Sequence, residues 1–365
     1  MNKKKNKVII SWFKGFGLKL CVLLISIAVS LTCAEMVLRI FPRFGNRYRL
    51  ELYKSDSPNI GTLNEPNNFV KFRPSAIVGY EIIPRSSAEV NSYGLIGREY
   101  KIKKSKNVYR ILVLGDSITQ MDWYVSSLQG RLNNCPRIDS GFEVWNAGVS
   151  GYAINQYTNY FKFKGVKYRP DMLIIGFCLN DFDMAGTLIT YKNAHGFTGY
   201  YYSGSKLERI VPTNRFLFKH SYLYRLLYLS LDHLLVGLNT EKYENEQMET
   251  GTEHLREIKS ICKSKNIILL GVIFPYLKSL EEYTAYELKE YNSMIKVLEG
   301  LGIDYIDLHH FFPKEREKLR ALRYYQGDFI HPSREGHELI ARTIYNYLIK
   351  KYNFCYEYSE FQKEN

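Results

Sequence analysis

Apolar runs and helical stretches alternate along the chain from about residue 108 to residue 350. Five short runs rich in Leu and β-branched residues are typical of buried strands, and they are Tyr109–Gly115, Phe142–Gly148, Asp171–Cys178, Asn266–Phe274 and Gly302–Leu308. Helical stretches separate these runs, and a last helix is expected over Ser333–Lys350. Strands that alternate with helices specify a parallel sheet with helices on both faces. We therefore predict an α/β fold over residues 107–352, a flavodoxin-like three-layer α/β/α domain with a five-stranded parallel sheet.

The N-terminal region carries a longer apolar segment. Residues 20–34 contain no charge, and a helix over residues 16–38 would be about 34 Å long, enough to cross the roughly 30 Å hydrocarbon core of a membrane. That length requires Lys19 and Glu35 to lie near the two interfaces, where a Lys can extend its amine to water. The pattern predicts a transmembrane anchor over residues 16–38.

The charges on either side of this segment predict its orientation. Six Lys precede the apolar run and four Arg follow it, and the positive-inside rule places the basic tail of residues 1–15 in the cytoplasm. The residues that follow the segment are then extracytoplasmic. A cleaved signal peptide, with Thr32-Cys33-Ala34 as its cleavage site, and a buried core helix are the alternatives.

The net charge of +13 follows from the same segment. The chain has 365 residues, of which 50 are Lys or Arg and 37 are Asp or Glu, yet the first 49 residues alone supply +9 and the remaining 316 supply +4. A basic surface across the folded domain, which a nucleic-acid partner would require, is therefore not expected. A hydrophobic content of 45% excludes disorder of the whole chain, and six Cys are too few for a disulfide scaffold.

Three segments fall outside the alternating pattern. Residues 39–106 are rich in Pro and polar residues and are predicted to form a stalk and a lead-in that packs on the domain. Residues 182–250 are rich in Tyr and Leu and too long for a simple connection, so we predict a cap-like insertion beside the site. Residues 353–365 are predicted to be a C-terminal tail. The disulfide state stays open for three cysteines: Cys135, Cys262 and Cys355.

Two candidate blocks lie at the C-terminal ends of the first two predicted strands. Gly115-Asp116-Ser117-Ile118-Thr119 places a Ser at a sharp strand-to-helix turn, where its hydroxyl is exposed and can act as a nucleophile. The same residue types are also ordinary helix caps. Asn146-Ala147-Gly148-Val149-Ser150-Gly151 has Gly positions at which a backbone N–H can approach a substrate oxygen, although a Gly-rich turn has the same composition.

Two further blocks lie at later strand ends. Asn180 and Asp181 follow the third strand, and an Asn carboxamide there can donate a hydrogen bond to an oxyanion. Asp328 and His331 lie three residues apart on the loop before the last helix, so the carboxylate can hold the imidazole from behind while the ring accepts the Ser proton. Each pair alone is also compatible with helix capping.

The four blocks together, in this order, resemble the GDSL/SGNH hydrolase superfamily, and in particular its membrane-anchored bacterial members. The resemblance covers about residues 108–350 and implies that Ser117 is the nucleophile, His331 the general base and Asp328 the residue that orients His331. It implies an oxyanion hole made of the backbone N–H groups of Ser117 and Gly151 and the side chain of Asn180. Two departures are the longer spacing from Gly176 to Asn180 and the sequence Gln120-Met121-Asp122 after the nucleophile.

The function that this resemblance implies is a carboxylic ester hydrolase, a serine esterase that acts through an acyl-enzyme. The expected substrate is an acyl ester with a small acyl group such as acetyl, carried by a cell-surface glycan. A polysaccharide O-acetyltransferase with the same triad, a lipase or lysophospholipase, and a non-catalytic surface protein are the alternatives. We expect no cofactor and no metal, because the spacing of His309, His310 and His337 is not that of metal ligands.

Overall fold

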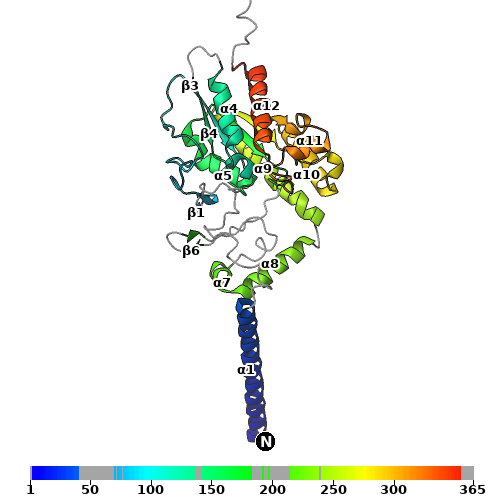
Figure 1. Ribbon diagram of the computed structural model, residues 1–365. Coiled ribbons are helices and arrows are strands. Elements are labelled where there is room, and N and C mark those ends of the chain that lie inside the picture. The colour runs from blue at the N-terminus through cyan, green and yellow to red at the C-terminus, as the bar shows by residue number, and fades with distance from the viewer. Residues whose placement is uncertain are drawn as a thin grey trace, which may run out of the picture. The chain divides into compact units, whose positions relative to one another are not determined.

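Five parallel strands form the central sheet of the protein. The computed structural model describes residues 2–40, 70, 72–75, 77–135, 141–182, 191–192, 196–197, 214–237 and 240–354. The strands are β3 (Val108–Leu114), β4 (Gly141–Asn146), β5 (Met172–Phe177), β8 (Ile268–Ile273) and β9 (Asp304–Asp307). They lie in the order β4-β3-β5-β8-β9 (Figure 1). This is the flavodoxin-like order. The second strand, β4, lies on one side of β3, and the later strands are added on the other side, so the switch point lies between β3 and β5.

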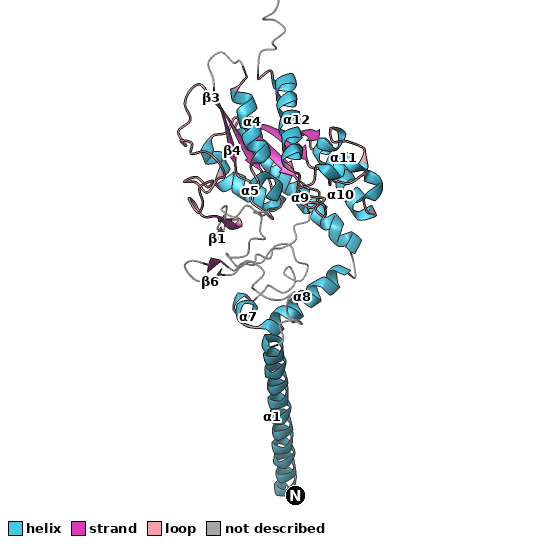
Figure 2. Ribbon diagram, in the orientation of Figure 1, coloured by secondary structure: helices cyan, strands magenta, loops and turns pink. Residues whose placement is uncertain are grey.

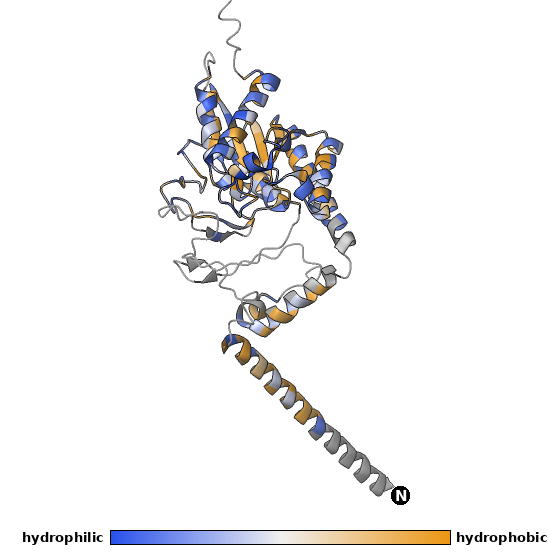
Figure 3. Cartoon of the chain, turned by 45° about the vertical axis from the view of Figure 1, so that its right-hand side comes forward, coloured by the Kyte–Doolittle hydropathy of each residue, from blue (hydrophilic) through white to orange (hydrophobic). Residues whose placement is uncertain are grey.

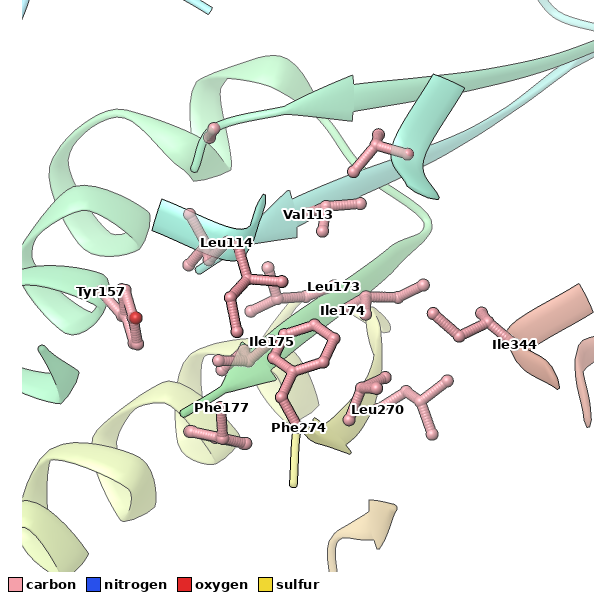
Figure 4. Close-up of a cluster of buried hydrophobic side chains, with 14 of the residues drawn as sticks. Val113, Leu114, Tyr157, Leu173, Ile174, Ile175, Phe177, Leu270, Phe274 and Ile344 are labelled. Atoms are coloured by element: carbon pink, nitrogen blue, oxygen red, sulfur yellow. The ribbon is translucent and has the colours of Figure 1, made fainter. Parts of the chain in front are cut away.

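Helices cover both faces of this sheet (Figure 2). They are α3 (Ser117–Gln120), α4 (Trp123–Asn133), α5 (Ile154–Phe163), α9 (Thr240–Ser264), α10 (Ala285–Gly300), α11 (Arg316–Ala321) and α12 (Arg334–Tyr352). Helix α4 packs against α12, and α5 packs against α9. In Figure 4, Tyr157 of α5 and Ile344 of α12 lie on opposite sides of the strands that carry Leu114 and Ile175. The predicted three-layer α/β/α fold is therefore confirmed, and each predicted strand is present with its ends shifted by one or two residues.

The core of the sheet is almost completely inaccessible to solvent. Residues 111–113 of β3 and 172–175 of β5 are all fully buried. A continuous apolar run is what a central parallel strand requires, because helices cover it on both faces. Short antiparallel pairs lie outside this sheet: β1 (Phe72–Ser75) with β2 (Gly79–Ile82), and β6 (Tyr191–Lys192) with β7 (Gly196–Phe197).

One charged side chain lies inside this apolar region. Arg110 of β3 is fully buried, and its guanidinium donates to the Glu143 carboxylate at 2.8 Å and to the carbonyls of Lys101, at 2.8 Å, and Ile102, at 3.0 Å. It also donates to the carbonyl of Tyr168. These bonds join the segment before β3 to the sheet.

Aromatic rings complete the attachment of the segment before β3. The Arg110 guanidinium lies 4.3 Å from the centre of the Trp145 ring, on which Tyr93 and Tyr100 stack.

The predicted C-terminal tail begins at residue 353, but Phe354 is buried. Residues 355–365 lie outside the described residues.

A second compact unit contains α1 (Asn2–Ile40), α7 (Arg215–His220) and α8 (Tyr222–Gly237). Within α1, the 22 residues Lys19–Ile40 are long and apolar enough to cross a membrane, and their most apolar stretch is unburied. Both a membrane anchor and a signal sequence have these properties. Of the described residues in the predicted insertion, 214–237 belong to this unit, whereas residue 182, β6, β7 and α9, which begins at Thr240, belong to the unit of the sheet. Its role as a cap stays a prediction.

Candidate active site

The turn after β3 places Ser117 at the start of a helix. Gly115 and Asp116 make the turn, and the Asp116 carboxylate accepts the N–H of Ile118 at 3.0 Å. A Cβ at Gly115 would collide with the side chain of Thr119, so the turn requires glycine. The hydroxyl of Ser117 is consequently presented at the C-terminal edge of the sheet, where open α/β sheets bind their ligands.

His331 lies against this hydroxyl. Its Nε2 is 2.8 Å from the Ser117 Oγ, although 214 residues separate the two along the chain. Its Nδ1 is 2.8 Å from the Asp328 Oδ2, and the other carboxylate oxygen of Asp328 accepts the backbone N–H groups of Ile330 and His331 at 2.9 and 3.0 Å. The structure thus brings the three residues predicted as a triad into one hydrogen-bonded chain.

The pKa values of His331 and Asp328 are shifted in opposite directions. Burial alone would lower the pKa of His331, but the hydrogen bond and charge of Asp328, with the charge of Asp116, raise it above the usual histidine value. Burial alone would raise the pKa of Asp328, but hydrogen bonds from His331 and from the N–H of Ile330 lower it below the usual value. Asp328 is therefore ionised at neutral pH, and its charge stabilises a protonated His331.

The second block is held against the nucleophile turn by hydrogen bonds. The Asn146 carboxamide donates to the carbonyl of Thr119 at 2.8 Å and to the Asp122 carboxylate at 2.7 Å, and its oxygen accepts the N–H of Gly148. The Gln120 side chain accepts the N–H of Ser150 at 2.7 Å. Gln120 and Asp122, the departures after the nucleophile, therefore connect the two blocks.

Gly148 allows this close approach. A Cβ there would lie 2.6 Å from the backbone nitrogen of Gln120, closer than side chains tolerate. Sequence reasoning placed Asn146 and Gly148 in the block but missed what they bind. In the sequence, the one indication of these contacts is that Asn146-Ala147-Gly148 lies at the end of a predicted strand.

Two of the predicted oxyanion donors are exposed. Gly151 has a φ of +76°, and the neighbouring carbonyl of Ser150 is held by the hydroxyl of Tyr80 at 2.6 Å. Asn180 is exposed, whereas the adjacent Asp181 is buried and accepts the Tyr157 hydroxyl at 2.9 Å. Among the described residues, none hydrogen-bonds to the N–H of Gly151 or to the carboxamide of Asn180. Their role as oxyanion donors stays a prediction.

The loop that carries Asp328 and His331 is fixed by its neighbours. The carbonyl of Phe329 accepts the N–H of Leu277 at 2.6 Å, and the carbonyl of His331 accepts the N–H of Tyr324 at 2.9 Å. The Arg323 guanidinium donates to the carbonyl of Leu277 at 2.8 Å. These contacts join the loop after β8 to the loop before α12, and sequence reasoning did not identify them.

The remaining histidines do not form a metal centre in the part of the chain that the structure describes, where no group of three His, Cys, Asp or Glu side chains has suitable positions. His337 of α12 is fully buried and stacks on Tyr124. Burial lowers the pKa of His337 to about 3, so this ring is neutral. His310 contacts the Asp307 carboxylate at 2.9 Å.

The doubly wound sheet carries the Ser117 turn at its C-terminal edge, and the loop of Asp328 and His331 lies against it. The chain belongs to the GDSL-like lipase/acylhydrolase family, whose model matches residues 113–339. Membership of this family supports a hydrolase that acts on an ester.

Solved structures of similar fold include an acetylxylan esterase from Geobacillus stearothermophilus, which is 17% identical with a TM-score of 0.42. The match covers 66% of this chain and 95% of that one. A GDSL-like lipase from Bacteroides thetaiotaomicron VPI-5482 is 12% identical with a TM-score of 0.38, over 66% of this chain and 88% of that one. No curated protein matches the chain in sequence.

Proposed function

We propose that the chain is a serine esterase in which Ser117 is the nucleophile, His331 the general base and Asp328 the residue that orients His331. The observation that carries this proposal is the unbroken hydrogen-bonded chain from the Ser117 Oγ through both ring nitrogens of His331 to Asp328, with 2.8 Å at each link. With its Nδ1 proton directed at Asp328, the ring has an acceptor lone pair on Nε2, which is what removal of the Ser117 proton requires.

In the acylation step, the Ser117 Oγ attacks the ester carbonyl carbon while its proton moves to the Nε2 of His331. The carbonyl oxygen becomes an oxyanion, and its donors are the N–H groups of Ser117 and Gly151 and the carboxamide of Asn180. The bond to the leaving alcohol then breaks, and that alcohol takes the proton from His331. The product of this step is an acyl ester of Ser117.

In the second step, water attacks the acyl-enzyme with His331 as base. The bond between the acyl carbon and the Ser117 Oγ breaks, and Ser117 regains its proton from His331. The side chain of His331 is 23% exposed, so water can reach the base.

The proposed location is the extracytoplasmic side of a membrane, with residues 19–40 as an uncleaved anchor and the substrate a small acyl ester on a surface glycan. The apolar span and the basic residues before it support this placement. Cys135 forms a disulfide bond, which is common in oxidising compartments and rare in the cytosol.

Hydrolysis of p-nitrophenyl esters from acetate to laurate by the full chain in detergent tests the activity. We expect the highest rate on acetate and loss of activity in Ser117→Ala. Ser105→Ala, which changes an exposed serine before β3, is the matched control and should retain full activity. A preference for laurate would favour a lipase, and transfer to an added oligosaccharide in excess of hydrolysis would favour an acetyltransferase.

A further inference from the structure

We propose that α8 lies on the membrane surface beside the anchor, with one apolar face in contact with lipid. This inference rests on the proposed membrane anchor and adds a second membrane-binding element to it. The observations that carry it all lie within the compact unit of α1, α7 and α8.

The first observation is that Glu35 of α1 holds the N-terminus of α8. Its carboxylate accepts the Ser221 hydroxyl at 2.9 Å and the backbone N–H groups of Tyr222 and Leu223 at 3.0 and 2.8 Å. The first N–H groups of a helix have no partner within the helix, and the helix dipole favours a negative charge there. An acidic residue in an apolar span is costly unless it is paired, and these contacts account for Glu35.

Arg39 completes this connection one turn later in α1. Its guanidinium pairs with Glu35 at 2.7 Å, donates to the carbonyl of His220 at 2.6 Å and lies 5.2 Å from the centre of the Tyr222 ring. Glu35 precedes the end of the apolar span at Ile40 by five residues, or about 7.5 Å of helix. The start of α8 is therefore held at the depth where the anchor leaves the membrane.

The second observation is an exposed apolar face on α8. Leu227, Leu231 and Leu234 are 57%, 46% and 56% exposed, and their spacing of four and three residues places them on one face of the helix. Tyr228, beside this face, is 5% exposed. Figure 3 shows apolar colouring along α8 as well as along the described part of α1.

A bilayer is the occupant that these two observations favour together. A helix with an apolar face that is fixed to the exit point of a membrane span can bury that face among acyl chains without crossing the membrane. The sequence of residues 215–237 also holds three basic residues and one acidic residue, which suits an anionic lipid surface.

Quenching of tryptophan by brominated lipids tests this proposal on the full chain. Leu231→Trp, Ile27→Trp and Phe311→Trp are each reconstituted in phosphatidylcholine–phosphatidylglycerol vesicles with brominated acyl chains, and the emission added over the parent chain is measured. Ile27 reports the anchor, and Phe311, which is 54% exposed in the catalytic unit, is a matched exposed apolar position. We expect Leu231→Trp to lose about half or more of its added emission, because an interfacial helix reaches roughly 5–10 Å into the lipid. Phe311→Trp should lose little.

The outcomes separate the two proposals. If Ile27→Trp is unquenched, the anchor itself is wrong. If Ile27→Trp is quenched while Leu231→Trp behaves like Phe311→Trp, the anchor stands and the proposal for α8 is overturned. A blue-shifted but unquenched emission from Leu231→Trp would also overturn it, because protein rather than lipid would then cover the apolar face of α8. Glu35→Ala, combined with Leu231→Trp, should reduce the quenching, and unchanged quenching would contradict the role of Glu35 as the tether.

Discussion

Asp328 and His331 are joined twice: one carboxylate oxygen lies 2.8 Å from the Nδ1 of the imidazole, and the other accepts the backbone N–H of the same histidine at 3.0 Å. The carboxylate thus fixes both the ring and the backbone that carries it. Because Asp328 also stabilises the protonated ring, the acid limb of the pH profile reports this contact directly.

Asp328→Asn should move that limb to lower pH. General-base action needs neutral His331, so activity of the parent enzyme falls as the pH is lowered through the pKa of His331, which lies above the usual value. Without the carboxylate, burial prevails and lowers the pKa of His331. Activity at the optimum should fall by roughly 10²–10⁴-fold, because a correctly positioned general base contributes this much to the rate and Asp328 positions His331. The measurement is kcat/KM for p-nitrophenyl acetate against pH, and an unmoved limb would argue against the assigned contact.

Asn180→Ala should lower kcat by about 10²–10³-fold, because an oxyanion-hole donor acts mainly in the transition state. The melting temperature should stay unchanged, because the side chain is exposed and makes no hydrogen bond to a described residue. Steady-state kinetics and thermal unfolding check both expectations. Asn134→Ala, at the exposed end of α4, is the control and should retain full activity. Equal kinetics in the two variants would remove Asn180 from the oxyanion hole.

Gly148→Ala should lower the free energy of unfolding by about 1–3 kcal/mol, the range for overpacking. The added methyl would lie 2.6 Å from the backbone nitrogen of Gln120 and 2.7 Å from the carbonyl carbon of Thr119, and backbone atoms cannot move aside cheaply. Urea unfolding gives the value. Gly130→Ala in α4 has no atom within 4 Å and should stabilise the protein by about 0.5–1 kcal/mol. Destabilisation of the same size in both variants would contradict this account.

Arg110→Ala should destabilise the domain by about 3–5 kcal/mol, since it removes one partner of a buried ion pair. The carbonyls of Lys101 and Ile102 lose their donor as well. The comparison is Arg131→Ala, which breaks a partly exposed pair with Glu338, with side chains 31% and 51% exposed, and should cost no more than about 1 kcal/mol. Denaturant unfolding of the two variants gives the difference, which should vanish if the Arg110 network is unimportant.

The strands and the four blocks could be predicted because their signals are local. A buried parallel strand shows as a continuous apolar run, and Asp328 and His331 are close in sequence. Arg110 lies within such a run, and nothing local indicates that its charge is paired with Glu143, 33 residues away. The bonds of Asn146 and Gln120 likewise depend on how two loops meet.

The contact between Glu35 and α8 likewise could not be predicted from local patterns, because its partners are even farther apart in the sequence. It joins residues 186 to 188 positions apart, whereas the composition and length of residues 182–250 indicate only a cap-like insertion. The sequence predicts for Glu35 only a position near the membrane interface. Its role as a hydrogen-bond acceptor depends on the position of the start of α8.

The central claim, that Ser117 is the nucleophile, is tested most directly by mapping the adduct of a fluorophosphonate. The reagent phosphonylates an activated serine with loss of fluoride, and peptide mass spectrometry locates the new bond. We expect one phosphonyl group, on Ser117, formed in parallel with the loss of esterase activity and absent from Ser117→Ala. An adduct on another residue, or esterase activity that survives in Ser117→Ala, would contradict the account.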